Sequence, residues 1–295
     1  MHVLVLGATG YVGTAVVDRL VRDGHHVSAV SRTAPADPRP RVTPVRADLA
    51  DPLAVAALVT PDVDAVVHTA APLGDADLPL VDALVDALAG SGRALLWTSG
   101  VWVLGRTEEG REDSPTAPVA LVAARPAVED RVRTAAGRGV RSVVVRPGVV
   151  HGRGGGIPAM LVGWAGALGH GRWVGADPAP RWPMVDVDDL ADLYALALDA
   201  ATPGALLHGV AEPGVPADLL ASAAARAAGV DGPAAAWPLD SAAAELGDAF
   251  AEALALDQVV QAPVARTLGW EPTRPAAVDD LATGSYAAAL STTTA

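Results

Sequence analysis

Three regularly spaced glycines, Gly7, Gly10 and Gly13, stand near the N-terminus between an apolar run at 3–6 and a segment with helical apolar spacing at 16–21. In a strand-turn-helix of this kind the first glycine allows a tight turn. The second lets the backbone approach a pyrophosphate, and the third lets the helix pack on the strand. The N–H groups that begin the helix can bind phosphate. The pattern predicts a dinucleotide site, with a merely structural turn as the alternative. Its predicted contacts are Gly7, Thr9, Gly10, Tyr11, Val12 and Gly13.

The residues after the second predicted strand, at 27–30, distinguish between two dinucleotides. An acidic side chain there binds the ribose hydroxyls of NAD, whereas a guanidinium can pair with the 2′-phosphate of NADP. The chain has Ser31 and Arg32 at this point, which favours NADP, with NAD as the alternative. A surface arginine beside a proline-rich loop would give the same pattern. After the third predicted strand, Asp48 and Leu49 fit a contact with the adenine edge, although Asp48 could also be a capping residue.

Two polar side chains are candidates for proton transfer. Ser99 follows the fifth predicted strand, at 94–98, where its hydroxyl could donate a hydrogen bond to a substrate carbonyl; strand-end capping is the alternative. His151 follows the sixth predicted strand, at 140–145. An imidazole near its free pKa of about 6.5 is a competent acid or base. A histidine in a flexible loop without any role is the alternative.

Arginines and tryptophans supply the candidates for substrate binding. Arg153 and Arg181 could bind an anionic group, or could be solvated loop residues. The indoles of Trp102, Trp173 and Trp182 could wall an apolar pocket. Packing between two domains explains the three tryptophans equally well, so both explanations stay open.

Composition excludes several other classes of chemistry. The chain has no cysteine, so disulfides and thiolate catalysis are excluded. The net charge of −13 argues against a nucleic-acid or anionic-membrane partner. We find no metal-binding motif, no G-x-S-x-G hydrolase elbow, no apolar run of membrane-spanning length and no signal peptide. We therefore expect no metal and a cytoplasmic location.

The 295 residues alternate between predicted strands and helices as far as residue 150. Such alternation predicts an α/β fold with a parallel, doubly wound sheet. A long helix is expected over 119–136, and further strands at 184–187 and 205–210. We expect a dinucleotide-binding domain over 1–150 plus about 184–210, and a small, mostly helical substrate-binding portion over about 151–183 and 211–295.

The order of the motifs resembles a known family. GATGYVG, HTAA, LLWTSGVWVLG, VVVRPGVVHGRGG, RWPMVDVDDLA and LGWEP occur in the order seen in the NAD-dependent epimerase/dehydratase family, the extended short-chain dehydrogenases. The resemblance covers most of the chain. It implies a Rossmann fold, a bound nicotinamide cofactor, and a substrate held under the C-terminal portion. It also implies that Arg181 contacts substrate. The cofactor contacts that it adds are Thr69, Ala70, Ala71, Pro147 and Gly148.

The chain departs from that family where the chemistry belongs. The family uses a tyrosine and a lysine four residues later, the lysine lowering the pKa of the phenol. This chain has 21 arginines and no lysine, and no tyrosine stands between the fifth and sixth predicted strands. Counting back from Glu129 places the pair at Leu121 and Arg125. Arg125 keeps the positive charge and can hold ribose hydroxyls, but it cannot titrate. The serine of the family falls at Gly100, next to Ser99.

Three functions remain open. The first is an NADP-dependent oxidoreductase that acts on a small carbonyl or hydroxyl compound, with Ser99, and His151 or a water, handling the proton. The second is an epimerase or dehydratase that regenerates its cofactor. The third is a non-catalytic dinucleotide sensor, because binding needs neither the tyrosine nor the lysine. Each implies a small-molecule ligand, and the sequence leaves the oligomeric state open.

Overall fold

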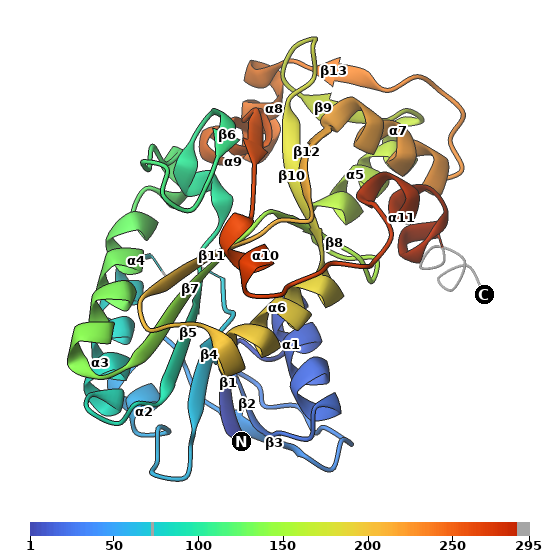
Figure 1. Cartoon of the computed structure of the whole chain (residues 1–295). Coiled ribbons are helices and arrows are strands. Elements are labelled where there is room, and N and C mark those ends of the chain that lie inside the picture. Colours follow the sequence, from blue (N-terminus) through green and yellow to red (C-terminus); the bar gives the residue numbers. More distant parts are fainter. Residues whose placement is uncertain (72–73, 288–295) are drawn as a thin grey trace.

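The computed structural model of the chain describes residues 1–71 and 74–287, which form two lobes (Figure 1). The first lobe contains a seven-stranded parallel sheet in the order β3-β2-β1-β4-β5-β7-β11. Its strands are β1 His2–Leu6, β2 His26–Ser31, β3 Val42–Arg46, β4 Ala65–His68, β5 Ala94–Thr98, β7 Arg141–Pro147 and β11 Ala205–Gly209. The strand order reverses between β1 and β4, as in a doubly wound sheet. In such sheets ligands bind at the carboxyl ends of the strands, at this reversal.

Helices cover both faces of this sheet. The first face packs on α1 Tyr11–Arg22 and α6 Val187–Ala200, and the second on α2 Pro52–Ala56, α3 Asp77–Leu88 and α4 Arg125–Thr134. Side chains in β1 alternate between the two cores: Val3 and Val5 enter the first, and Leu4 and Leu6 the second. Because both faces are buried, the strand is a continuous apolar run, which explains why the sequence revealed it.

The predicted helix over 119–136 is broken into three parts. A 3-10 turn at Ala120–Val122 precedes α4 Arg125–Thr134, and another at Ala135–Arg138 follows it. Pro126 lies in the first turn of α4, where its missing N–H costs nothing. Arg125 is therefore the first residue of α4, with Leu121 about one helical turn before it.

The second lobe has a separate core and more strands than expected. The segment predicted as a strand at 184–187 is β10 Arg181–Asp186, which lies outside the main sheet and pairs with β8 Val149–His151 and β12 Glu212–Pro216. Its helices are α5 Gly156–Leu168, α7 Ala217–Ala227, α8 Leu239–Leu246, α9 Asp248–Leu254 and α11 Ala277–Thr283, and its other strands are β9 Arg172–Val174 and β13 Ala235–Trp237. Its hydrophobic core draws on residues from Val149 to Tyr286.

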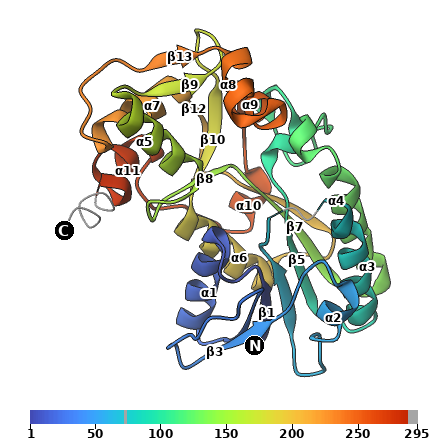
Figure 2. The same ribbon diagram turned by 180° about the vertical axis from the view of Figure 1, so that it is seen from behind.

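The second lobe follows the carboxyl end of β7, since only Gly148 separates β7 from β8. Figure 2 shows the lobe on that side of the sheet. A two-stranded sheet of β6 Thr107–Gly110 and β14 Gln258–Val260 and the short helix α10 Pro263–Thr267 connect the lobes. Within 1–71 and 74–287, none of the helices has the length and apolar character to cross a membrane.

Candidate functional site

The glycine turn between β1 and α1 has the backbone that a bound pyrophosphate requires. Gly7 has φ +81°, and a Cβ there would lie 2.7 Å from backbone atoms of Ala70. A Cβ on Gly13 would collide with the carbonyl oxygen of Gly7. Gly10 is exposed and caps α1 without any side-chain hydrogen bond, so the first N–H groups of the helix stay available. The segment after β4 thus packs against the turn at Gly7, while the turn is exposed to solvent at Gly10.

Tyr11 and Val12, which follow the turn, have packing roles in this structure. The Tyr11 hydroxyl donates a 2.7 Å hydrogen bond to the carbonyl oxygen of Gly152, and its ring fills the space beside Gly155. Burial raises the pKa of Tyr11 well above its usual value. Val12 packs on the core of the first lobe. In the segment after β4, Thr69 is buried and its hydroxyl donates to the carbonyl oxygen of Leu6.

A cavity of about 160 Å³ lies between the glycine turn and the segment after β2. Its lining residues are Ala8, Thr9, Thr14, Ala29, Pro35, Ala36, Asp37, Arg39 and Pro44. Nearby, Ser31 is buried and accepts a hydrogen bond from the Ala34 N–H, whereas Arg32 is exposed. No residue in the described part of the chain forms an ion pair or hydrogen bond with the Arg32 side chain. Arg32 thus offers a free positive charge at the carboxyl end of β2.

Asp48 and Leu49, predicted to meet the adenine, have separate environments. Asp48 is exposed, and one carboxylate oxygen accepts from the Ala50 N–H, 3.0 Å away. The cap of α2 is instead Asp51, which accepts from the Ala54 N–H. Leu49 is buried in the core on the second face of the sheet. Of the two side chains, Asp48 is therefore the one that can reach a ligand.

The carboxyl end of β5 brings together hydroxyl groups. The Thr98 hydroxyl donates to the carbonyl oxygen of His68 and also contacts the Tyr194 hydroxyl from α6. Tyr194 is fully buried, and burial raises its pKa above the usual range. The Ser99 hydroxyl is buried without any hydrogen-bond partner among the described residues. Since an unpaired buried hydroxyl is costly, Ser99 is the group here that a ligand oxygen would satisfy.

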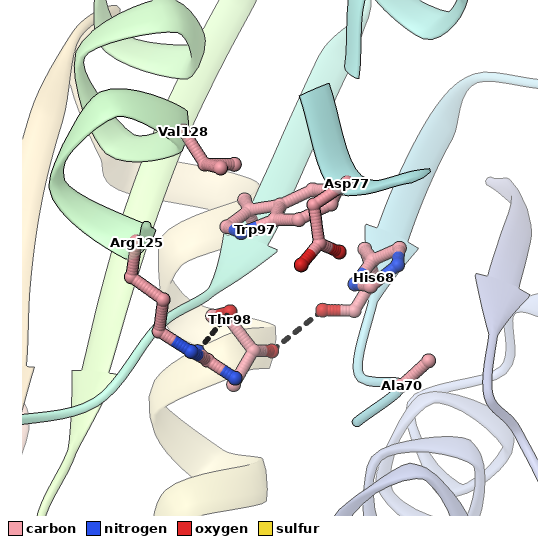
Figure 3. A pocket seen from close by; sticks show the side chains of 7 residues that line it. All are labelled: His68, Ala70, Asp77, Trp97, Thr98, Arg125 and Val128. Carbon is pink, nitrogen blue, oxygen red and sulfur yellow. Dashed lines mark hydrogen bonds between the residues drawn. The ribbon is translucent and has the colours of Figure 1, made fainter. Parts of the chain in front are cut away.

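Arg125 extends from the start of α4 to this same point. One of its terminal nitrogens donates a 3.1 Å hydrogen bond to the carbonyl oxygen of Thr98, and its Nε is buried without a partner among the described residues. Burial lowers its pKa, while Asp77, Glu129 and Tyr194 oppose that shift. Figure 3 shows Arg125 and Asp77 projecting from different helices toward the space beside Thr98 and His68.

That space is a cavity of about 10 Å³, which is the size of one water molecule. The His68 ring stacks on Trp97 at 3.9 Å between ring centroids, and neither ring nitrogen has a hydrogen-bond partner in the described residues. Burial, together with the charge of Arg125, lowers the pKa of His68 to about 3. His68 is therefore neutral at pH 7, and Arg125 is the positive charge of this region.

The structure places His151 in a different, buried cluster. Its ring is 1% exposed, and Nδ1 lies 3.2 Å from a carboxylate oxygen of Asp280 and 4.0 Å from one of Asp186. Burial works to raise the pKa of Asp280, but hydrogen bonds from His151 and Ser285 outweigh it, and the pKa is lowered. The loop after β8, expected to be flexible, is held by Tyr11 and by Tyr286, whose hydroxyl donates to the Gly155 carbonyl oxygen. His151 thus joins β8 to α11 rather than to Ser99.

The two candidate anion-binding arginines already have acidic partners. Arg153 has φ +51° and bridges Asp18 of α1 to Asp188 of α6, at 2.7 and 2.6 Å. Arg181 donates to both carboxylate oxygens of Asp257 and, at 2.7 Å, to Glu108. The hydrogen bonds that Arg181 donates to Asp257 and Glu108 raise the pKa of Arg181. Two carboxylates therefore balance each charge, and neither guanidinium is free as Arg32 is.

Of the three candidate tryptophans, two lie in the core of the second lobe. Trp182 is 2% exposed and donates its indole N–H to the Leu254 carbonyl oxygen at 3.0 Å, and Trp173 is buried in the same core. Both therefore pack within one lobe, and neither lies between two domains as the alternative explanation expected. Trp102 is half-buried in the 3-10 turn Val101–Leu104, which Gly100 separates from Ser99, so of the three it is nearest in sequence to the candidate site.

Comparisons with known proteins identify the family of the chain. The model of the NAD dependent epimerase/dehydratase family matches residues 3–207. The chain belongs to this family. The epimerase family protein SDR39U1 of Bos taurus is 32% identical, over 72% of this chain and 74% of its own. The 2-alkyl-3-oxoalkanoate reductase of Stenotrophomonas maltophilia is 31% identical, over 72% and 69%. The crystal structure of human SDR39U1 with NADPH has a TM-score of 0.75 and 27% identity, covering 97% of this chain and 99% of that one.

Membership of the epimerase/dehydratase family confirms the resemblance and the Rossmann fold. Sequence reasoning missed several residues that this member of the family brings together, namely His68, Asp77, Thr98 and Tyr194. His68 belongs to the recognised HTAA segment, so its motif was a usable signal. Tyr194 stands 96 residues from its partner Thr98, and only the packing of α6 reveals that contact.

Proposed function

We propose that this member of the epimerase/dehydratase family is an NADP-dependent oxidoreductase that acts on a small carbonyl or hydroxyl compound. The observation that carries the proposal lies at the carboxyl end of β5, where the unpaired Ser99 hydroxyl follows Thr98, whose carbonyl oxygen accepts a hydrogen bond from Arg125. The glycine turn opens at the strand-order reversal of the same sheet. A dinucleotide that spans these points brings its nicotinamide to Ser99.

The residues present fit a dinucleotide. Side chains are excluded at Gly7 and Gly13 but not above Gly10, which leaves a cradle for the pyrophosphate. Ala70 and Ala71 follow β4 beside the turn, and the peptide around Pro147 and Gly148 lies close to Gly100. A Cβ on Gly100 would be 3.9 Å from the Pro147 carbonyl oxygen. We propose that these two segments, Ala70–Ala71 and Pro147–Gly148, contact the cofactor.

The free charge of Arg32 favours NADP over NAD, because a guanidinium pairs with a 2′-phosphate. The related human SDR39U1 structure contains NADPH, which supports the same choice. NAD remains the alternative, since Asp37 also lines the cavity beside the glycine turn and a carboxylate accepts hydrogen bonds from ribose hydroxyls.

The bound cofactor would supply or accept a hydride. In the proposed site Arg125 holds the ribose hydroxyls next to the nicotinamide, in place of the lysine of the family. Ser99 donates a hydrogen bond to the substrate oxygen and orients it. Neither group exchanges a proton at neutral pH, so the proton comes from water. Trp102 contacts the substrate from the turn after Ser99.

A dinucleotide sensor is the second candidate function, and Leu121 favours it. Leu121 stands one helical turn before Arg125 and is 42% exposed, where the family places its tyrosine. Its side chain cannot move a proton. By contrast, the similarity to a 2-alkyl-3-oxoalkanoate reductase supports carbonyl reduction, and we place that first. An epimerase or dehydratase would use the same groups without net change in cofactor.

The test is a titration with NADPH and NADH, followed by a panel of small carbonyl compounds. Consumption of NADPH with a carbonyl substrate is the expected result. Tight cofactor binding with no turnover across the panel would indicate that the protein is a dinucleotide sensor. Conversion of a substrate without net cofactor change would indicate an epimerase or dehydratase. Failure to bind either dinucleotide would overturn the proposal.

A further inference from the structure

A row of buried polar side chains crosses the carboxyl edge of the main sheet. Figure 1 shows β5, β7 and β11 side by side, and each gives one residue to the core on the second face, namely Trp97, Val144 and Leu206. Because side chains alternate between the two faces, the residues two positions further along, Ser99, Arg146 and His208, face the same way, and all are buried. Strand pairing sets His208 beside Arg146, and the Ser99 N–H still bonds to β7, at the Val145 carbonyl oxygen. Neighbouring strands lie about 4.8 Å apart, so the three side chains adjoin one another.

Each member of the row has a buried polar atom without a hydrogen-bond partner among the described residues. These atoms are Ser99 Oγ, Arg146 Nη1 and His208 Nε2. Nε and the second terminal nitrogen of Arg146 both donate to Glu129 of α4, so Nη1 is the donor that is left over. Burial lowers the pKa of His208 to about 4, so the ring is neutral at pH 7. Its Nδ1 lies 2.8 Å from the Gln261 carbonyl oxygen, and since a carbonyl oxygen only accepts, Nδ1 carries the hydrogen and Nε2 is a free acceptor.

Glu112 extends the row from His208 to the surface. It follows β6, and its Oε1 accepts a 3.2 Å hydrogen bond from the His208 backbone N–H. Its Oε2 is buried and has no partner in the described part of the chain, whereas the neighbouring residues Arg111 and Asp113 are exposed. Burial raises the pKa of the Glu112 carboxyl above its usual value. The row therefore begins at a carboxyl group next to solvent and ends at the proposed site of reduction.

Water is the ligand whose chemistry fits these atoms. A buried water typically makes about three hydrogen bonds, and it can both donate and accept. Arg146 Nη1 offers a donor, while His208 Nε2 and Glu112 Oε2 offer acceptors. The acceptors disfavour an anion, and the charge of Arg146 disfavours a cation. Since unpaired buried polar atoms are costly, water between them stabilises the folded chain.

We propose that Glu112, His208, Arg146 and Ser99 bind a chain of buried water molecules that carries protons from the surface to the substrate oxygen. This inference rests on the proposed reduction of a carbonyl compound, and it names the route of the proton. As the carbonyl carbon accepts the hydride, its oxygen takes a proton from the water at Ser99. One O–H bond of that water breaks, and the O–H bond of the product alcohol forms.

The remaining steps restore the chain. Each following water passes a proton to the hydroxide before it, and the Glu112 carboxyl returns the last proton and takes one from solvent. Arg146 and His208 are positioning residues, because they hold and orient the waters without changing their own protonation. The net reaction consumes one hydride and one solvent proton for each carbonyl group reduced.

A high-resolution crystal structure of the protein, with and without NADPH, tests the water chain independently of activity. We expect ordered waters within hydrogen-bond distance of His208 Nε2 and Glu112 Oε2, and a further water toward Ser99. A row in which these atoms bond directly to one another, with no water between them, would overturn the inference.

The kinetic test is Glu112→Gln, which keeps an acceptor oxygen for the His208 N–H but cannot exchange a proton. Hydride transfer to the best carbonyl substrate of the panel should slow about 10- to 100-fold, while the affinity for NADPH stays unchanged. Added imidazole buffer should restore part of the rate, because a small acid in solution replaces the carboxyl group. Structural damage alone would not respond to buffer. The matched control is Glu109→Gln, at an exposed carboxylate that pairs with Arg111, and it should change neither the rate nor the buffer response.

Thermal unfolding checks that each variant is folded. If Glu112→Gln does not fold, His208→Leu, which removes the Nε2 acceptor and interrupts the chain, should slow hydride transfer to a similar degree. An unchanged rate in the folded variant, or a loss that imidazole does not relieve in Glu112→Gln, would overturn this inference and leave the proposed reduction intact. A wild-type protein that contains the waters but reduces no carbonyl compound would overturn the proposed function, and the proton transfer with it.

Discussion

The turn between β1 and α1 and the junction between β5 and α4 differ in how they meet the family's requirements. In the first region, we propose that backbone geometry does the binding, since a Cβ on Gly7 or Gly13 would collide with the backbone and one on Gly10 would enter the proposed phosphate site. In the second, we propose that a few side chains do the chemistry, and Leu121 and Arg125 are the residues that we align with the tyrosine and the lysine of the family. The two glycines that shape the turn, Gly7 and Gly13, are also needed for the first lobe to fold. Reacting side chains at a cleft can change while the fold persists.

The largest effect is expected at Gly10. Gly10→Val fills the space of the pyrophosphate, and its Cβ meets within the protein only the Gly7 carbonyl oxygen at 3.2 Å. We expect both cofactors to lose about 3 kcal/mol or more, about 100-fold, with little loss of folding stability. Calorimetric titration measures this. Gly137→Val, at an exposed glycine with open space around its Cβ direction, is the control. Unchanged affinity in Gly10→Val would place the cofactor elsewhere.

The next effect tests whether Arg125 has taken over the role of the lysine. Arg125→Ala should weaken both cofactors by roughly 1.5–3 kcal/mol, as for hydrogen bonds from a charged group, and should lower turnover. Arg131→Ala, on the same helix but paired with Asp82 at the surface, should change neither quantity. Equal behaviour of the two variants in titration and in turnover would show that Arg125 has only a structural role.

The pH dependence of the free energy of unfolding should report on the second region, because the buried His68 belongs to it. Its folded pKa of about 3 lies below its unfolded value of about 6.5, so the unfolded chain binds a proton that the folded chain does not. Stability is complete above about pH 6.5 and is lost as the pH falls toward 3, by about 2 kcal/mol at pH 5. His68→Gln should flatten this dependence in chemical denaturation. Equal slopes for the two proteins would contradict a neutral, buried His68.

The smallest effect is expected at Arg32, which is exposed and screened by solvent. Arg32→Ala should weaken NADPH by about 1–2 kcal/mol and leave NADH nearly unchanged. Raising the salt concentration should reduce the difference between wild type and variant. Equal losses for both cofactors would exclude a role at the 2′-phosphate.

The first region could be predicted from the sequence because its signals are local. The apolar run of β1, the glycine spacing and the helical pattern of α1 adjoin one another, and the structure agrees with each. The second region could be located but not described. His68, Thr98, Arg125 and Tyr194 come from four separate segments, and only the folded sheet brings them together. The burial of His151 depends on Asp280, 129 residues away, which no local pattern reveals.

The measurement that tests the contrast most directly is the pH dependence of hydride transfer in wild type and in the double variant Leu121→Tyr/Arg125→Lys. Leu121 is exposed in the 3-10 turn that precedes α4, four residues before Arg125, so the substitutions restore the Tyr-x-x-x-Lys spacing of the family. With the best carbonyl substrate of the panel, we expect the double variant to be faster and to show an alkaline break from the new phenol, which the wild type lacks. A wild-type profile that already shows this break, or a folded double variant with an unchanged rate and profile, would contradict the account.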